Sequence, residues 1–266
     1  MCAHRTPQHM NDPVFRGVGV ALVTLFDANG ELDAPATAEL AVRLVDLGVR
    51  AVLVAGTTGE AAALDLQERN RLLAAVREAV PKSSGVPVIA GTGAASARQA
   101  TLLTAAARDG GADAVLTLSP PGSQSLGPYY EAVGKAASGM PVLAYHFPDV
   151  SAPGIAVEAL ADLPVAGLKD SSGDPDRLLH TLDSWDRPLY VGSSALIYLA
   201  GALGCAGTIL GLSNAEPEAC VAAFAGDAGA QLKLAKAHRA AGERFPAGIK
   251  ELVMARFGYP ATLRIG

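Results

Sequence analysis

The sequence predicts an α/β fold, a (β/α)8 TIM barrel with extra C-terminal helices. Short apolar runs alternate along the chain with Ala- and Leu-rich stretches of helical periodicity. The apolar runs are nearly continuous, as in parallel strands that are covered on both faces. The length of 266 residues fits one barrel domain, which typically has about 250 residues.

Eight apolar runs are the candidate strands. They are residues 18–24, 51–55, 87–91, 114–118, 142–145, 165–169, 189–192 and 207–210. Parallel strands need crossover connections, so we expect a helix after each strand. An open doubly wound sheet is the alternative, but the first strand-to-helix turn lacks the glycine fingerprint of a dinucleotide site.

The segments between these runs carry apolar residues at helical spacing. The candidate helices are residues 37–47, 67–80, 99–108, 129–137, 175–182 and 195–203. Three more follow the last strand, at residues 217–225, 230–243 and 249–257, and should pack outside the barrel or in an oligomer interface. We therefore divide the chain into a flexible N-terminal arm (1–16), the barrel (17–216) and a C-terminal helical extension (217–266).

The composition indicates a compact globular protein. Half of the residues are hydrophobic and 18% are charged, which argues against disorder. The net charge of −5 and the pI near 5.5 argue against a nucleic-acid partner. No apolar stretch is long enough for a membrane span, and residues 1–16 lack the apolar run of a signal peptide.

The three cysteines, Cys2, Cys205 and Cys220, are spaced too far apart for a zinc motif. They are expected to be reduced thiols in a reducing compartment. We therefore expect a cytoplasmic enzyme.

Lys169 is the most informative residue of the chain. It ends the apolar run of the sixth predicted strand, and the active sites of such barrels lie at the carboxyl ends of the strands. A buried lysine held as the neutral amine is a nucleophile toward a carbonyl carbon. The alternative is a structural lysine paired with Asp170 or Asp174. The other lysines fall in helical or loop segments where an exposed ammonium is ordinary: Lys82, Lys135, Lys233, Lys236 and Lys250.

Tyr145 ends the strand before that of Lys169. Consecutive parallel strands of a barrel are neighbours, so the phenol can approach the amine at the same end of the barrel and move protons there. The alternative is an ordinary aromatic residue of the barrel core. His146 follows directly and should point to the opposite side of the strand, where it would position a loop rather than act as a base.

The pentapeptide Gly56-Thr57-Thr58-Gly59-Glu60 follows the second predicted strand. Its glycines allow a close turn whose amide N–H groups can bind a carboxylate, and the threonine hydroxyls add donors. A threonine that only caps the next helix is the alternative. Gly192 and Ser193 stand in the equivalent place after the seventh strand.

These motifs together resemble the dihydrodipicolinate synthase / N-acetylneuraminate lyase superfamily of pyruvate-dependent aldolases, from about Phe15 to the C-terminus. The matching motifs are Gly56-Thr-Thr-Gly-Glu60, Ala90-Gly-Thr-Gly93, Tyr145-His-Phe-Pro148 and Gly167-Leu-Lys-Asp-Ser-Ser-Gly173. The resemblance implies a Schiff-base lysine at Lys169, a proton-relaying Tyr145, and Thr57 and Thr58 at the substrate carboxylate. It also implies that Gly192 and Ile209 line the pocket through their backbones. We therefore expect Lys169, Tyr145 and Thr57 to be catalytic, and the substrate-binding residues to be Thr58, Gly56, Gly192, Ile209 and Ser193.

The sequence departs from the dihydrodipicolinate synthases of this superfamily in two places. Residues 148–153 contain no arginine, where those enzymes carry one that grips the carboxylate of aspartate semialdehyde. Residues 119–123 contain no tyrosine pair, where those enzymes have one that reaches the partner subunit's site. Tyr129 and Tyr130 come later and should begin the next helix. The stretch Lys169-Asp-Ser-Ser-Gly-Asp174 resembles the members that cleave 4-hydroxy-2-oxo or 2-oxo-3-deoxy acids.

The leading hypothesis is reversible aldol cleavage or condensation of a 2-oxo acid (pyruvate) with an aldehyde through an imine on Lys169. The imine itself stabilises the carbanion, so we expect no metal and no cofactor. The resemblance also implies a homo-oligomer, a dimer or a tetramer. Three alternatives stay open: a dihydrodipicolinate synthase with an arginine from another loop, a catalytically weak oxo-acid-binding paralogue, and a phosphosugar-binding barrel. The last would use Gly192-Ser-Ser194 and Gly211-Leu-Ser-Asn214, which no basic residue accompanies.

Overall fold

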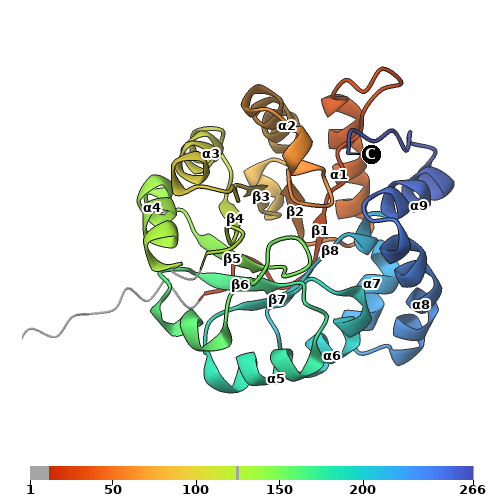
Figure 1. Ribbon diagram of the computed structural model, residues 1–266. Helices are drawn as coiled ribbons and strands as arrows, with labels where there is room; N and C mark the ends of the chain where they lie inside the picture. Colours follow the sequence, from red (N-terminus) through yellow and green to blue (C-terminus); the bar gives the residue numbers. More distant parts are fainter. Residues whose placement is uncertain (1–11, 124–125, 266) are drawn as a thin grey trace, which may run out of the picture.

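The computed structural model describes residues 12–123 and 126–265, and these form a closed barrel with helices around it (Figure 1). In these residues eight parallel strands pair in sequence order, and β8 closes on β1. The predicted fold class is therefore confirmed. The strands are β1 (Gly17–Ala21), β2 (Ala51–Val54), β3 (Val88–Gly91), β4 (Ala114–Leu118), β5 (Val142–His146), β6 (Gly167–Asp170), β7 (Leu189–Val191) and β8 (Gly207–Leu210).

The predicted crossover helices are all present. They are α1 (Ala34–Asp46), α2 (Leu66–Ala79), α3 (Ala97–Asp109), α4 (Gly127–Ala137), α5 (Pro175–Ser184) and, after the short 3-10 helix η4 (Ser194–Leu196), α6 (Ile197–Ala202). Some start earlier than the apolar pattern suggests, because a polar cap sets the first residue. Asp65 and Glu68 form a capping box at the start of α2, and the Asp33 side chain caps α1.

The expectation of a helix after every strand is wrong for β5. The described chain forms only the 3-10 helix η3 (Val157–Asp162) there. Pro153 and Pro164 stand on either side of this segment. A proline lacks the amide donor and disfavours helical backbone at the residue before it, so the two leave little room for an α-helix.

A side chain from the segment before β1 fills the amino-terminal end of the barrel interior. Phe15 is buried and its ring stacks on Tyr190 with centroids 4.7 Å apart. The Phe15 amide donates to the Tyr190 hydroxyl at 3.2 Å, and burial raises the pKa of that hydroxyl to about 12. The end of the predicted flexible arm is thus part of the barrel core, whereas residues 1–11 lie outside the described residues.

The C-terminal extension supplies α7 (Pro217–Phe224), α8 (Ala228–Glu243) and α9 (Ala247–Phe257). Figure 1 shows them outside the barrel, beside α6 and α1. Helix α8 contacts η4 after β7, and α9 contacts η5 (Leu212–Asn214) after β8. The extension therefore reaches the end of the barrel where the strands terminate.

Two cysteines can be placed in the fold. Cys205 and Cys220 are buried free thiols, and burial raises the pKa of Cys205 to about 11, so neither is placed to react. Cys2 lies outside the described residues. Across residues 12–123 and 126–265, no helix combines the length and apolar character needed to cross a membrane.

Candidate active site

Lys169 and Tyr145 meet inside the barrel. They are direct partners in the register of β6 and β5, and side chains alternate between the two faces of a strand, so both face the interior. The Lys169 Nζ lies 4.2 Å from the centroid of the Tyr145 ring. The predicted approach of the phenol and the amine is therefore present.

Lys169 is buried, with 4% of its surface exposed. Among the described residues no carboxylate forms an ion pair with it. Asp170 binds the Arg177 Nε at 2.6 Å instead, and Asp174 caps the start of α5. The alternative of a structural lysine paired with Asp170 or Asp174 is therefore wrong.

His146 and Asp170 point outward from the same two strands and hold the loops behind the site. The His146 Nδ1 accepts the amide of Ile155 at 2.8 Å, and Arg177 donates to the Ile155 carbonyl at 2.7 Å. The Asp170 carboxylate accepts the backbone and hydroxyl of Ser172. This confirms the loop-positioning role predicted for His146.

The loop after β2 forms a tight turn in which Gly59 N donates to the Gly56 carbonyl at 3.0 Å. Gly59 is required because a Cβ there would lie 2.8 Å from the Leu22 carbonyl oxygen. The amide N–H groups of Thr57 and Thr58 donate to no other described residue. Two free donors at the end of a buried strand form a concave site that suits an anion.

Glu60 completes this loop and has a buried partner that the sequence did not reveal. Its carboxylate lies 2.5 Å from the Lys250 Nζ, and both side chains are fully buried. The other carboxylate oxygen accepts the amides of Arg264 and Ile265, each at 2.8 Å. The expectation that Lys250 is an ordinary exposed lysine is therefore wrong, because the folded C-terminal segment encloses it.

A cavity of about 530 Å³ opens at the carboxyl end of the strands. Six of the eight predicted site residues line it: Thr58, Tyr145, Lys169, Gly192, Ser193 and Ile209. The structure does not bring Thr57 and Gly56 to this cavity. The side chains of Thr57 and Thr58 face different sides of the turn, so Thr57 lines a neighbouring groove and Gly56 contributes a turn carbonyl.

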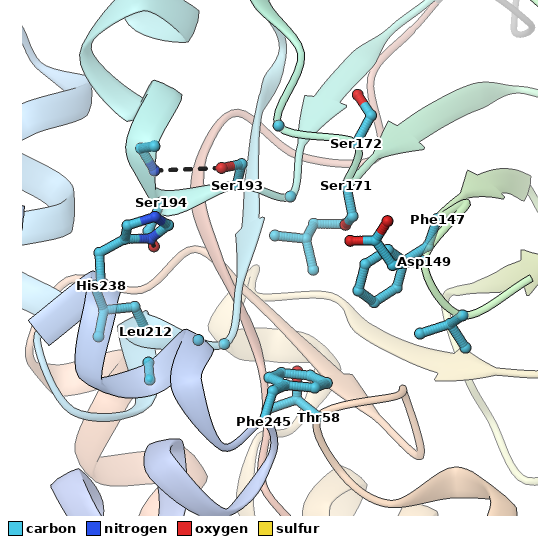
Figure 2. A pocket seen from close by; sticks show the side chains of 18 of the residues that line it. Thr58, Phe147, Asp149, Ser171, Ser172, Ser193, Ser194, Leu212, His238 and Phe245 are labelled. Carbon is cyan, nitrogen blue, oxygen red and sulfur yellow. Dashed lines mark hydrogen bonds between the residues drawn. The ribbon is translucent and has the colours of Figure 1, made fainter.

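Several residues of the cavity were missed by the sequence reasoning. Ser171 donates its hydroxyl to the Tyr145 hydroxyl at 3.3 Å, and a Cβ on Gly192 would lie 1.9 Å from the Ser171 Oγ. Figure 2 shows Asp149 on the side of Ser171, with His238 and Ser194 across the cavity. The position of Ser171 at the end of β6 could have indicated its role. His238 lies on α8, whose sequence pattern carries no such signal.

The cavity has few charges for its size. Among the described residues that line it, Lys169 is the one lysine or arginine and Asp149 the one carboxylate. The remaining polar groups are hydroxyls and the His238 imidazole. No group of three or more His, Cys, Asp or Glu side chains is placed to hold a metal ion within the described chain.

A parallel barrel with a buried amine beside a tyrosine, and with free amide donors in the turn after its second strand, has the groups that a Schiff-base lyase needs. The chain belongs to the Dihydrodipicolinate synthetase family, which it matches over residues 14–253. Members of this family are pyruvate-dependent lyases that form a Schiff base, so this protein is a carbon–carbon lyase of that family.

Relatives and solved structures agree with this assignment. A 4-hydroxy-tetrahydrodipicolinate synthase of Pseudomonas aeruginosa is 36% identical over 80% of this chain and 77% of its own. An uncharacterised DapA-like lyase of Halobacterium salinarum is 36% identical over 84% of this chain and 76% of its own. The structure of YagE from E. coli K12 in complex with pyruvate has a TM-score of 0.84 and 25% identity, covering 94% of this chain and 92% of that one.

Proposed function

We propose that the protein cleaves and forms a bond between a 2-oxo acid, pyruvate, and an uncharged hydroxylated aldehyde, through an imine on Lys169. The observation that carries this proposal is the buried Lys169 amine, which has no carboxylate partner among the described residues and lies beneath Tyr145 in an open cavity. An amine in this place, with no carboxylate bound to it, is available to attack a carbonyl carbon.

In the first step the Lys169 amine attacks the keto carbon of the 2-oxo acid, and loss of water leaves the imine. The free amides of Thr57 and Thr58 and the Thr58 hydroxyl would hold the substrate carboxylate. Gly192, Ser193 and Ile209 line the rest of the cavity, as substrate-binding residues would. The Thr57 side chain faces the neighbouring groove, so its predicted catalytic role stays a prediction, as does a binding role for Gly56.

In the second step the bond between C3 and C4 breaks, its electrons pass to the imine, and the proton of the C4 hydroxyl is removed. Tyr145 is the group that would move this proton. Its hydroxyl accepts a hydrogen bond from Ser171, so the phenol proton is free to pass to the hydroxyl that leaves as water in the first step. The resulting phenolate then takes the C4 hydroxyl proton and can return it to the enamine. Protonation of the enamine and hydrolysis of the imine then release the 2-oxo acid.

Borohydride trapping tests the proposal. Treatment with pyruvate and borohydride should attach pyruvate covalently to the peptide that contains Lys169, and peptide mass spectrometry identifies it. In Lys169→Ala the adduct should disappear, and turnover should fall by at least about a thousandfold. Lys236 is exposed on α8, so Lys236→Ala is the matched control and should be trapped like the wild type. A wild-type enzyme without an adduct on Lys169 would end the proposal.

A second candidate is 4-hydroxy-tetrahydrodipicolinate synthase, the activity named for several relatives that are about 35% identical. That reaction condenses pyruvate with aspartate semialdehyde, which carries a carboxylate. No arginine lines the cavity in the described residues, and Arg177 is already bound to Asp170. Turnover with aspartate semialdehyde comparable to that with hydroxylated aldehydes would favour this second candidate. An adduct on Lys169 without turnover of any aldehyde would favour a weak oxo-acid-binding paralogue.

We also propose that a second copy of the chain covers the groove next to the cavity. This groove of about 630 Å³ is lined by side chains from α2, α3 and the C-terminal segment. Four exposed apolar residues meet in it: Leu66, Leu102, Val150 and Ile265. A solved relative with a TM-score of 0.85 and 27% identity is described as the first monomeric dihydrodipicolinate synthase variant. Thr57 also lines the groove, so the partner would lie beside the substrate loop.

A further inference from the structure

The outer part of the cavity holds a serine–histidine pair that the proposed imine chemistry does not use. The Ser194 Oγ and the His238 Nδ1 are 2.7 Å apart, and both residues line the cavity that contains Lys169. Ser194 begins η4 in the loop after β7, whereas His238 comes from α8 in the C-terminal extension. Figure 2 shows the two side by side, across the cavity from Asp149 and Ser171.

One ring nitrogen of His238 is hydrogen-bonded within the described residues and the other is not. Its Nδ1 is engaged by Ser194, and its Nε2 has no partner among the described residues. An imidazole bound through Nδ1 presents Nε2 as a donor or an acceptor, according to the tautomer. A substrate hydroxyl can both donate and accept, so it fits either tautomer.

A second residue of α8 also holds this helix against the barrel. Gln231 lies about two turns before His238 on α8 and also joins α8 to η4. Its Nε2 donates to the Ser194 carbonyl at 3.0 Å. Its Oε1 accepts the Tyr198 amide at 2.9 Å. Gln231 does not line the cavity. The same contact between α8 and η4 therefore offers a structural residue and a cavity-facing residue that can be compared.

We propose that His238, held by Ser194, is a specificity-determining residue that binds a hydroxyl group of the aldehyde portion of the substrate through its Nε2. This inference rests on the proposed aldolase function and adds a residue of the C-terminal extension to the substrate site. The cavity of about 530 Å³ is within the range of about 300–1,000 Å³ that small-ligand sites have, so it has room beyond a 2-oxo acid.

The charges of the cavity select the kind of aldehyde. Asp149 contributes the carboxylate on the side of the cavity opposite His238. The Lys169 amine forms the imine, so it is not available to pair with an anion on the aldehyde. A carboxylate or phosphate on the aldehyde would have no lysine or arginine to pair with among the described lining residues, and burying an unpaired anion is costly. Hydroxyl groups find partners in His238, Ser194 and Asp149.

Two conservative substitutions of His238 distinguish the roles of its two ring nitrogens. The amide nitrogen of glutamine falls near the position of the imidazole Nε2, and the amide group of asparagine falls near Nδ1. His238→Gln should therefore keep the substrate contact, whereas His238→Asn and His238→Ala should lose it. The test compares two 2-oxo acids that differ only in the hydroxyl groups beyond C4. The measured quantity is the ratio of their kcat/KM values.

The wild type should prefer the hydroxylated substrate. His238→Ala and His238→Asn should each lower the ratio by about tenfold, the loss expected for one hydrogen bond to a neutral group. His238→Gln should keep the ratio within about threefold of the wild type, and Gln231→Ala should leave it unchanged. Any purely structural effect of the substitutions would lower both kcat/KM values together.

Equal ratios in the wild type and His238→Ala would overturn the inference, and so would a wild type that accepts neither substrate or prefers the one without hydroxyls. Borohydride trapping of pyruvate on the wild type keeps the two proposals apart. An adduct on Lys169 with an unchanged ratio means that the inference about His238 fails while the imine proposal stands. The absence of the adduct means that the proposed function itself fails.

Discussion

At the scale of single residues, two buried lysines differ in the side chains that contact them, and this difference separates their roles. Lys250 is fully enclosed and pairs with Glu60 at 2.5 Å, and its Nζ also donates to the Thr262 carbonyl at 2.6 Å. Lys169 is equally buried but contacts the face of the Tyr145 ring rather than a carboxylate. Burial lowers the pKa of Lys250, and the Glu60 carboxylate opposes that shift. The Lys250 amine is engaged by Glu60 and Thr262, whereas the Lys169 amine has no carboxylate partner among the described residues and lines the cavity. The two residues therefore have structural and chemical roles respectively.

Lys250→Met should destabilise the protein by about 3 kcal/mol, because it leaves the Glu60 carboxylate buried without its cation. Urea unfolding followed by circular dichroism measures the change. Lys236 is exposed on the preceding helix, so Lys236→Met should change the free energy of unfolding by less than about 0.5 kcal/mol.

The double variant Glu60→Gln with Lys250→Met should recover part of that loss, because no charge then stays unpaired. The double variant could instead lose more free energy of unfolding than the losses of the two single variants added together. In that case the Glu60–Lys250 ion pair does not stabilise the fold in this way.

At the scale of elements, the loops behind the site are tied together by polar side chains from β5, β6 and α5. His146 binds the Ile155 amide, Arg177 binds the Ile155 carbonyl, and Asp170 binds Arg177. These bonds join the long segment after β5 to β6 without an α-helix between them. The segment carries Phe147, Asp149 and Val150 into the cavity wall, so the polar contacts replace the missing helix as its support.

The stability of this region should depend on pH through His146. Burial lowers the pKa of His146 from its ordinary value of 6.5, Asp170 opposes the shift and Arg177 adds to it. As the pH falls below 6.5 the unfolded chain takes up a proton that the folded chain refuses until its lower pKa is reached. The free energy of unfolding should therefore fall with pH in that interval and be unaffected by His146 above it.

Urea unfolding at pH 7.5 and pH 5.5 tests this dependence. His146→Asn keeps an acceptor for the Ile155 amide but cannot titrate, so it should lose less stability on acidification than the wild type. His180 is half exposed on α5, and His180→Asn should keep the wild-type dependence. Identical pH dependence in the wild type and His146→Asn would contradict the assignment.

Much of the barrel could be predicted because its signals are local. The apolar runs and helical stripes placed each strand within a few residues, and the strand period set Lys169 and Tyr145 on one face and His146 on the other. The segment after β5 was less predictable, because the prolines and long-range bonds that shape it leave no periodicity. Thr57 and Thr58 are adjacent, so only the turn geometry could separate the one that faces the cavity from the one that faces the groove.

At the scale of the whole molecule, four exposed apolar side chains gather in one groove beside the active site. Leu66, Leu102, Val150 and Ile265 are 42–58% exposed and line the same groove. Exposed apolar residues gathered in one patch indicate an interaction surface more strongly than the same residues scattered singly. The tyrosines of α4 play no part in this groove: Tyr129 and Tyr130 are buried and bind backbone carbonyls within the subunit.

Leu102→Asp should weaken self-association by at least about tenfold, because it places a charge in the apolar centre of the proposed interface. Light scattering coupled to size-exclusion chromatography measures the mass over a range of concentrations. Leu232 is 76% exposed on α8, away from the groove, so Leu232→Asp should keep the wild-type mass. A wild type that is monomeric at all concentrations would refute the interface.

The sequence by itself determined the barrel, the place of Lys169 at the end of a buried strand, and its pairing with Tyr145 on the next strand. These features follow from periodicities of two and 3.6 residues, which neighbouring side chains encode. Only the tertiary structure decided that Lys250 is buried with Glu60, that His238 faces the cavity, and that Asp170 is occupied by Arg177. Each of these depends on how a helix packs against a loop from another part of the chain, and no local pattern records that contact.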